Sequence, residues 1–167
     1  MIIEAAAAGD RGAVWEVLEP AIRAGETLAL PRDMDRDDAF AYWFDPEYEV
    51  FVARDADGIV GTYCLRANRK GGGAHVANCG YVAAASASGR GVGRAMCEHS
   101  IAQARAGGFR AMQFNFVVST NLPAVALWRS LGFAIVGTLP GAFRHKDLGY
   151  VDAYVMYRSL EDLEVAG

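Results

Sequence analysis

The stretch Ser88-Gly89-Arg90-Gly91-Val92-Gly93-Arg94 decides the fold of this chain. It follows an apolar segment that ends in Tyr81-Val82-Ala83 and precedes an amphipathic segment that runs to residue 106. Glycines between a strand and a helix let backbone N–H groups turn toward the helix N-terminus, where they favour an anion such as a pyrophosphate. The stretch therefore predicts a strand, a phosphate-binding loop and a helix in succession.

A second motif, Asn121-Leu122-Pro123-Ala124, opens a later helix that we expect to reach residue 131. Asn121 is a favourable N-cap, and Pro123 is tolerated in the first turn of a helix. A side chain that only caps the helix and one that also serves a ligand site are both compatible with this position.

The remaining elements follow from hydrophobic periodicity and from turn residues. A polar segment at residues 32–38 precedes the second helix, and Asp55-Ala56-Asp57-Gly58 predicts a hairpin turn. Residues 140–149 are expected to form a long polar loop. The expected strands are residues 2–6, 49–54, 59–66, 75–84, 112–118, 133–138 and 151–158, and the expected helices are residues 10–24, 39–44, 90–106 and 121–131. This order predicts an α/β (α+β) fold, with a mixed central sheet of about seven strands and about four helices on its two faces.

Composition limits the classes of protein that fit. The 167 residues are 53% hydrophobic and 22% charged, which indicates one globular domain over residues 1–167. A net charge of −4 argues against non-specific nucleic-acid binding. No signal peptide and no apolar run of the ~20 residues that span a bilayer is visible, so no membrane partner is expected. The cysteines have neither metal-site nor disulfide spacing, and they indicate a reducing cytoplasm: Cys64, Cys79 and Cys97.

The motifs together resemble the GCN5-related N-acetyltransferase superfamily, over most of the chain. That family's loop reads Gln/Arg-x-x-Gly-x-Gly/Ala and falls here on Ser88 to Gly93, with Ser88 departing at the first position. The stretch Asn121-x-x-Ala124-x-x-Leu127-Trp128-x-x-Leu131-Gly132-Phe133 follows at the family's spacing. The resemblance implies a mostly antiparallel sheet, acetyl-CoA as cosubstrate, no metal, and a homodimer.

The resemblance also implies roles for single residues in holding acetyl-CoA. Backbone groups of one strand would bind the pantetheine arm, with a backbone N–H near Val82 or Ala83 polarising the thioester. Backbone N–H groups of the glycine loop would hold the pyrophosphate, and the Arg90 and Arg94 side chains are also placed to meet it. The implied cofactor-binding residues are Tyr81, Val82, Ala83, Gly89, Arg90, Gly91, Val92, Gly93, Arg94, Asn121, Ala124 and Trp128.

A narrower resemblance concerns the proline-analogue (azetidine-2-carboxylate) N-acetyltransferase branch. It rests on His75-Val76-Ala77-Asn78-Cys79-Gly80-Tyr81, on Phe114-Asn115-Phe116-Val117 with Thr120-Asn121, and on Val151-Asp152-Ala153. In that branch the asparagines equivalent to Asn78, Asn115 and Asn121 are implicated in acceptor binding and reaction. If Asn115 faces the core instead, its amide must be paired with another polar group.

The general acid is not evident from the sequence. The family's usual acid tyrosine corresponds to Trp128, and an indole N–H does not deliver a proton. Candidate replacements are Tyr63, Tyr81, Tyr150 and Tyr154, and His145 is a weaker candidate for a general base. Arg144 or Lys146 could meet an acceptor carboxylate, or could simply be solvated.

Three hypotheses remain open at this point. The first is an acetyl-CoA-dependent N-acetyltransferase that acts on a small amine or an amino acid by direct attack on the thioester. The second is a non-catalytic acyl-CoA-binding or sensing module, motivated by Ser88 and Trp128. The third is a nucleotide-binding domain that uses the same kind of glycine loop.

Overall fold

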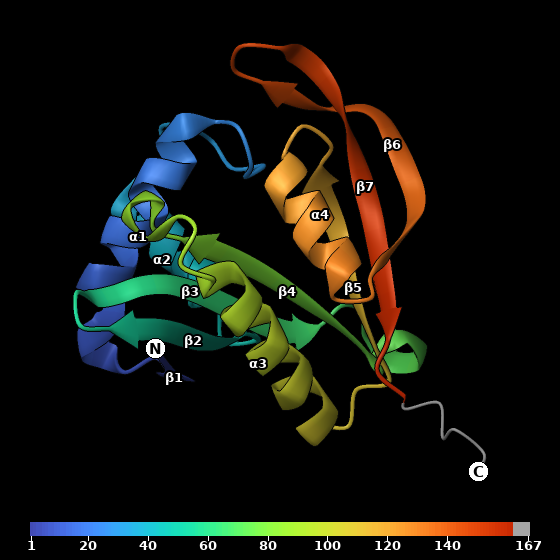
Figure 1. Cartoon of the computed structure of the whole chain (residues 1–167), viewed down its shortest axis with the longest axis horizontal. Coiled ribbons are helices and arrows are strands. Elements are labelled where there is room, and N and C mark those ends of the chain that lie inside the picture. The colour runs from blue at the N-terminus through green and yellow to red at the C-terminus, as the bar shows by residue number, and fades with distance from the viewer. Residues whose placement is uncertain (162–167) are drawn as a thin grey trace.

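A computed structural model describes residues 1–161 and contains one seven-stranded sheet in the order β1-β2-β3-β4-β5-β7-β6 (Figure 1). The strands are β1 (Ile2–Ala5), β2 (Glu49–Asp55), β3 (Gly58–Ala67), β4 (Val76–Ala83), β5 (Ala111–Val118), β6 (Ala134–His145) and β7 (Gly149–Ser159). The helices are α1 (Arg11–Ala24), α2 (Arg36–Trp43), α3 (Val92–Ala106) and α4 (Leu122–Ser130). All strand pairs are antiparallel except β4 with β5, so the expected order of elements and the mixed sheet are confirmed.

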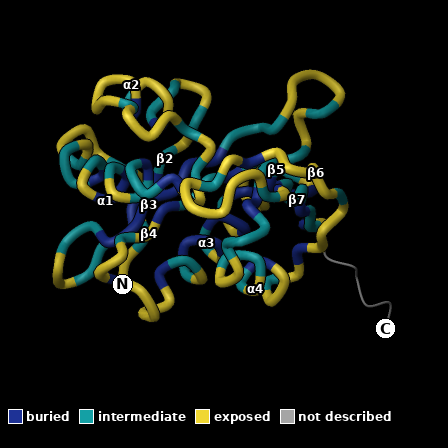
Figure 2. The backbone as a smooth tube through the Cα atoms, turned by 90° about the horizontal axis from the view of Figure 1, so that it is seen from above, coloured by how far each residue is buried: buried dark blue, intermediate teal, exposed yellow. Residues whose placement is uncertain are grey.

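Helices cover both faces of the sheet. One apolar cluster joins α1 and α2 to one face of β2, β3 and β4, and a second joins α3 and α4 to the opposite face. Figure 2 shows the buried backbone concentrated in the strands at the centre, with exposed segments on the outer helices and loops. Gly61 permits the close approach of α3, because a Cβ there would lie 2.8 Å from Val92 Cγ1.

The sheet opens between β4 and β5. These parallel strands pair only at Val76–Ala111 and Ala77–Met112, although β4 continues to Ala83 and β5 to Val118. The Asn78 side chain follows the last pair at once, and its Nδ2 donates to the Gln113 carbonyl at 3.0 Å. Asn78 therefore bridges the point at which the two strands diverge.

The prediction of a loop at residues 140–149 is wrong, because most of these residues belong to a long β6–β7 hairpin whose turn is only residues 146–148. Pro140 is tolerated because the register shifts between Leu139 and Phe143, where a residue without an N–H costs no regular ladder bond. The Asp152 carboxylate accepts from the Gly141 N–H at 2.9 Å and stabilises this irregular part of the hairpin.

Two helices begin at other residues than expected. Helix α2 starts at Arg36, inside the expected polar segment, because Asp35 caps it by accepting from the Asp38 N–H at 2.8 Å. Helix α3 starts at Val92 rather than Arg90, since Gly91 adopts a left-handed conformation. The other boundaries differ from the expected ones by a few residues, as helix and strand ends commonly do.

The tip of the β6–β7 hairpin contacts the segment that follows α1. The Lys146 N–H donates to the Gly25 carbonyl at 3.3 Å, and Lys146 Nζ lies 3.8 Å from Glu26 Oε1. This contact joins the two halves of the molecule on either side of the opening between β4 and β5.

Candidate functional site

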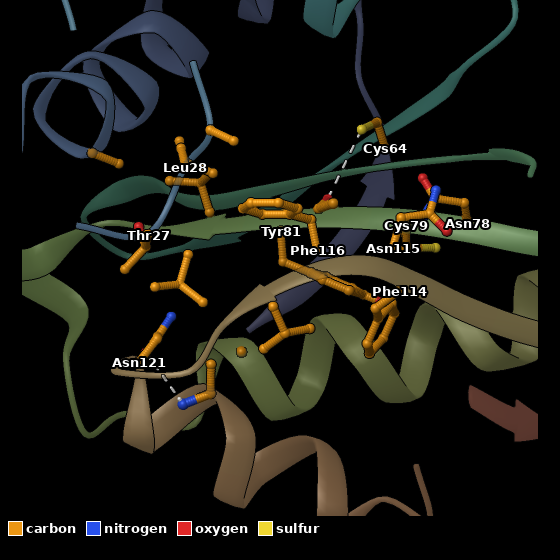
Figure 3. A pocket seen from close by; sticks show the side chains of 18 of the residues that line it. Thr27, Leu28, Cys64, Asn78, Cys79, Tyr81, Phe114, Asn115, Phe116 and Asn121 are labelled. Carbon is orange, nitrogen blue, oxygen red and sulfur yellow. Dashed lines mark hydrogen bonds between the residues drawn. The ribbon is translucent and has the colours of Figure 1, made fainter. Parts of the chain in front are cut away.

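A cavity of about 580 Å³ occupies the opening between β4 and β5 (Figure 3). Helices α3 and α4 contribute Gly93, Met96, Ala124, Leu127 and Trp128 to one part of its wall. The other part comes from the segment after α1, helix α2, the segment before β2 and strand β3, and it includes Thr27, Leu28, Ala29, Leu30, Tyr42, Tyr48, Cys64 and Arg66. The cavity is thus shaped by elements that lie far apart in the sequence.

The backbone of β4 offers hydrogen-bonding groups to this cavity. The Ala84 N–H donates to the Val60 carbonyl, and the Asn68 N–H donates to the Val76 carbonyl, so even-numbered residues of β4 bond to β3. By alternation, Tyr81 and Ala83 turn their backbone groups toward the cavity. The Val82 backbone groups face β3, so the Val82 N–H does not point toward the cavity as was expected for a group that serves the cofactor.

The glycine loop has free N–H groups at the start of α3. Among residues 1–161, the N–H groups of Gly89, Gly91, Val92, Gly93 and Arg94 have no hydrogen-bond acceptor in the chain. Gly89 and Gly91 both have φ of 76°, a conformation that side chains with a Cβ rarely adopt. The loop therefore presents several N–H groups of one helix N-terminus together, as an anion site requires.

The two arginine side chains of this loop are already engaged. Arg90 pairs with Asp55 and, at 2.9 Å, with Asp57 in the β2–β3 turn. Arg94 donates to Ser130 Oγ at 2.8 Å and lies 3.6 Å from Glu98. In this structure these side chains fasten the loop to the hairpin and to α4, and the expectation that they meet a phosphate stays a prediction.

The three expected asparagines do not form one cluster. Asn78 and Asn115 lie near each other at one end of the cavity, and Asn121 lies at the other end (Figure 3). Asn115 Nδ2 donates to Asn68 Oδ1 at 2.7 Å, and its Oδ1 accepts from Gln113 Nε2 at 2.9 Å. Asn115 is therefore paired as a polar residue in a buried setting must be, in a network that includes Asn68 and Gln113.

The Asn115 side chain reaches the cavity because β5 is irregular there. The register with β7 shifts between Phe114 and Val117, so Asn115 and Phe116 lie in a bulge. Asn121 is the N-cap of α4, with its Oδ1 3.4 Å from the Ala124 N–H, and it also lines the cavity. Its position is thus compatible with both roles considered from the sequence.

Trp128 is a buried wall of the cavity. It is 8% exposed, and its ring lies 5.0 Å from the Tyr81 ring and 5.1 Å from the Phe114 ring. These distances are those of packed aromatic side chains. Trp128 therefore combines core packing with a contact to the cavity.

Of the four expected substitute acids only Tyr81 lines the cavity, and its hydroxyl is already hydrogen-bonded. The Tyr63 hydroxyl contacts His99 Nδ1 at 2.7 Å, and the Tyr81 hydroxyl contacts Ser100 Oγ at 2.7 Å; burial raises the pKa of both tyrosines. Tyr150 is 74% exposed, and neither it nor Tyr154 belongs to the cavity lining. His145 Nδ1 accepts from the Asp147 N–H at 3.1 Å, so this nitrogen shapes the hairpin turn.

Several cavity residues were missed by reasoning from the sequence. Tyr48 and Arg66 line the cavity, and Asn68 supports Asn115 from the segment after β3. Burial raises the pKa of Tyr42 and of Tyr48, so both keep their hydroxyl proton near neutral pH. A charged residue at the end of an apolar strand was the one available signal for Arg66.

Within residues 1–161, no group of three or more His, Cys, Asp and Glu side chains gathers in a way that could hold a metal ion. The same part of the chain contains no helix that is long and apolar enough to cross a membrane. The polar side chains of the described residues that line the cavity are amides, phenols, the Thr27 hydroxyl, the thiols of Cys64 and Cys79, and the Arg66 guanidinium.

Comparison with known proteins assigns the family. The family model described as "Acetyltransferase (GNAT) family" matches residues 14–133. The N-acetyltransferase aca1 of Schizosaccharomyces pombe is 29% identical over 161 residues, covering 84% of this chain and 77% of that protein. The structure of a GCN5-related N-acetyltransferase from Kribbella flavida has 43% identity and a TM-score of 0.90, covering 95% of this chain and 96% of that one. The protein yncA from Salmonella typhimurium, solved with its cofactor acetyl-CoA, has 23% identity and a TM-score of 0.82, covering 97% of this chain and 95% of that one.

The chain belongs to the acetyltransferase (GNAT) family. It is an N-acetyltransferase, and the fold expected from the resemblance is confirmed. Membership in a family of enzymes does not favour the alternative of a non-catalytic acyl-CoA-binding module, nor that of a nucleotide-binding domain.

Proposed function

We propose that this N-acetyltransferase binds acetyl-CoA between β4 and β5 and transfers the acetyl group directly to the amine of a small amino-acid acceptor. The observation that carries the proposal is the cavity itself, which joins unpaired backbone groups of β4 to the N-terminus of α3. The yncA structure, which contains acetyl-CoA, has the same fold.

The cofactor would extend along β4 from the glycine loop. Its pyrophosphate would accept from the free N–H groups between Gly89 and Arg94, where the helix dipole also favours negative charge. Its pantetheine arm would bond to the backbone of Tyr81 and Ala83, in place of the missing β5 partner. Trp128 would border the thiol end.

The reaction needs no covalent enzyme intermediate. The neutral amine attacks the thioester carbon, a C–N bond forms, the C–S bond breaks, the amine loses a proton and the CoA thiolate gains one. A β4 backbone N–H of Tyr81 or Ala83 would stabilise the developing oxyanion. No Asp or Glu lines the cavity within residues 1–161, so we assign proton transfer to water and the positioning of the amine to asparagine amides.

Asn78 and Asn115 would position the acceptor. Asn78 donates through Nδ2 to Gln113, which leaves its Oδ1 to accept from the acceptor amine. Asn115 is held from both sides by Asn68 and Gln113, so its orientation is fixed before a ligand arrives. Asn121, at the other end of the cavity, would contact the cofactor.

The test is release of free thiol from acetyl-CoA in the presence of amino acids, proline analogues, polyamines, aminoglycosides and a basic peptide. Asn115→Ala should abolish turnover while acetyl-CoA still raises the melting temperature, as a ligand of the folded state must. Binding of acetyl-CoA without turnover on any acceptor would favour the hypothesis of a non-catalytic acyl-CoA-binding module. A rise in melting temperature with a nicotinamide dinucleotide but not with CoA would favour the hypothesis of a nucleotide-binding domain.

The narrower assignment, to the azetidine-2-carboxylate N-acetyltransferase branch, is part of this proposal. Its support is the placement of Asn78 and Asn115 together beside the opening of β4 and β5. Acetylation of azetidine-2-carboxylate in preference to other acceptors would support it, and acetylation of polyamines alone would contradict it.

We further propose a single catalytic domain over residues 1–167, a cytoplasmic location and a homodimer, with neither nucleic-acid nor membrane partners. Three free buried cysteines fit a reducing compartment, and the net charge of −4 is unsuited to nucleic acid. Exposed apolar side chains on β6 and β7, among them Val136 and Tyr150, supply a surface for a second copy. Analytical ultracentrifugation tests the dimer.

A further inference from the structure

Arg66 stands opposite Asn78 on the neighbouring strand. The two residues are register partners in the β3–β4 pair, so their side chains emerge side by side on the same face of the sheet. The Arg66 guanidinium carbon lies 4.6 Å from the centre of the Tyr48 ring, and Tyr48 also lines the cavity. Arg66 is thus held against an aromatic wall at the end of the cavity that contains Asn78 and Asn115.

The charge of Arg66 is only weakly compensated. Its Nη1 lies 3.8 Å from Glu47 Oε2, which is too long for a hydrogen bond, while Lys70 Nζ contacts the same carboxylate at 3.0 Å. Arg66 Nε is buried and has no hydrogen-bond partner in the described structure. Nε itself is covered, but the Arg66 side chain as a whole is 35% exposed and lines the cavity, so its charge is open to an anionic acceptor group.

No other charged side chain lines the cavity within residues 1–161. The two basic residues expected from the sequence to meet an acceptor carboxylate, Arg144 and Lys146, are not among the lining residues, and Lys146 lies near Glu26 and Asp147. The cavity therefore carries one positive charge in a protein with a net charge of −4.

We propose that Arg66 is the carboxylate-recognition residue of the acceptor site and that the acceptor is a small 2-amino acid. This inference rests on the proposed N-acetyltransferase function and adds the residue that selects the acceptor by its carboxylate. A guanidinium recognises a carboxylate through paired N–H donors. Because Asn78 lies beside Arg66, a carboxylate on Arg66 places an amine on the adjacent carbon next to Asn78 and Asn115.

The same charge excludes other amines. A polyamine, an aminoglycoside or a lysine side chain would bring a second positive charge next to Arg66, and no carboxylate of the described residues lines the cavity to compensate it. Such repulsion between like charges discriminates among acceptors even where the amines are equally nucleophilic.

The experiment compares three probes of one ring system, L-proline, L-prolinamide and pyrrolidine, together with azetidine-2-carboxylate and the standard amino acids. Turnover is measured with the wild-type enzyme, Arg66→Gln, Arg66→Lys and the control Lys70→Gln. Lys70 contacts the same Glu47 carboxylate but is 89% exposed and does not line the cavity. Loss of a charge-assisted pair should raise KM for the preferred carboxylate acceptor about ten- to hundredfold in Arg66→Gln, with a smaller rise in Arg66→Lys.

Lys70→Gln should behave as the wild type, and the acetyl-CoA melting shift should be the same in all four proteins. The inference is overturned if prolinamide or pyrrolidine is acetylated as well as the acids, or if Arg66→Gln keeps the preference for carboxylates. Thermal shift with CoA and each acid gives a readout independent of turnover. Absence of an Arg66-dependent shift also overturns the carboxylate site, whereas absence of turnover on every amine overturns the proposed function instead.

Discussion

Gly91→Ala separates the conformational role of the glycine loop from its binding role. Gly91 has φ of 76° and ψ of 15° and is the N-cap of α3. A Cβ at this position would have no atom within 4 Å, so the cost of the substitution is confined to the backbone. The left-handed conformation costs a residue with a Cβ about 1–2 kcal/mol. For a chain of this length that cost lowers the melting temperature by about 2–8 °C.

The effect on acetyl-CoA depends on how the loop relieves this strain. If residue 91 leaves the left-handed region, the free N–H groups of Val92 and its neighbours change direction. Loss of one charge-assisted hydrogen bond to phosphate costs about 1.5–3 kcal/mol, or about ten- to hundredfold in Kd. The acetyl-CoA-dependent melting shift should therefore be visibly smaller in Gly91→Ala than in the wild type.

Gly149→Ala is the matched control. Gly149 also has φ of 76° with open space where a Cβ would stand, but it lies in the β6–β7 hairpin, away from the glycine loop. The melting temperature should fall by a similar amount in both variants. The affinity for acetyl-CoA, measured by calorimetric titration, should fall only in Gly91→Ala. Equal acetyl-CoA affinity in the two variants would refute the assignment of these N–H groups to the pyrophosphate.

Three further predictions concern the core. Thr62→Val should lower the free energy of unfolding, measured in urea, by about 1–3 kcal/mol, because buried Trp43 Nε1 donates to the Thr62 hydroxyl at 3.1 Å. The control Thr120→Val removes a buried hydroxyl that has no partner in the described structure and should leave that free energy unchanged. Burial lowers the pKa of His99 in the folded protein, so the stability that the neutral imidazole contributes is complete above about pH 6.5 and is lost as pH falls through the lowered value. The urea midpoint of the wild type should therefore fall between about pH 7.5 and 5.5, and His99→Phe should flatten that fall. An unchanged slope in the variant would contradict this. Burial raises the pKa of the Cys64 thiol to about 12, and the other two cysteines are also buried. A disulfide reagent at about pH 8 should therefore modify no cysteine in the native protein and all three after unfolding. Rapid modification of the native protein would show that the cavity wall opens.

Local sequence determined the elements that depend on neighbouring residues. The glycine loop, the Asn121 cap and the alternation of apolar residues specify their own backbone conformation, and the order of strands and helices was predicted from them. The extension of β6 to His145 and of β7 back to Gly149 was not predicted, because the irregular part of this hairpin is stabilised by Asp152 acting on Gly141, eleven residues away. Pro140 and Gly141 are typical of a loop unless such a distant partner is present.

The partners of polar side chains were decided only by tertiary structure. Asn115 was predicted as a site residue, yet its partner Asn68 lies 47 positions away in a segment with no regular signal. Arg90 was predicted to meet phosphate, and the fold brings Asp55 from the end of β2 and Asp57 from the following turn to it as ion-pair partners. No local pattern encodes such contacts, because a hydrogen bond or an ion pair depends on where two chain segments meet.

The sequence by itself therefore determined a strand–loop–helix unit with an anion site, a capped helix and the family to which the motifs belong. The tertiary structure decided that β4 and β5 separate after two residue pairs and that Val82 turns its backbone away from the resulting cavity. It also decided that, among residues 1–161, Arg66 is the one charged side chain that lines this cavity. The physical reason is that backbone conformation is set by interactions along the chain, whereas a cavity and its charge are set by packing between segments that are distant in sequence.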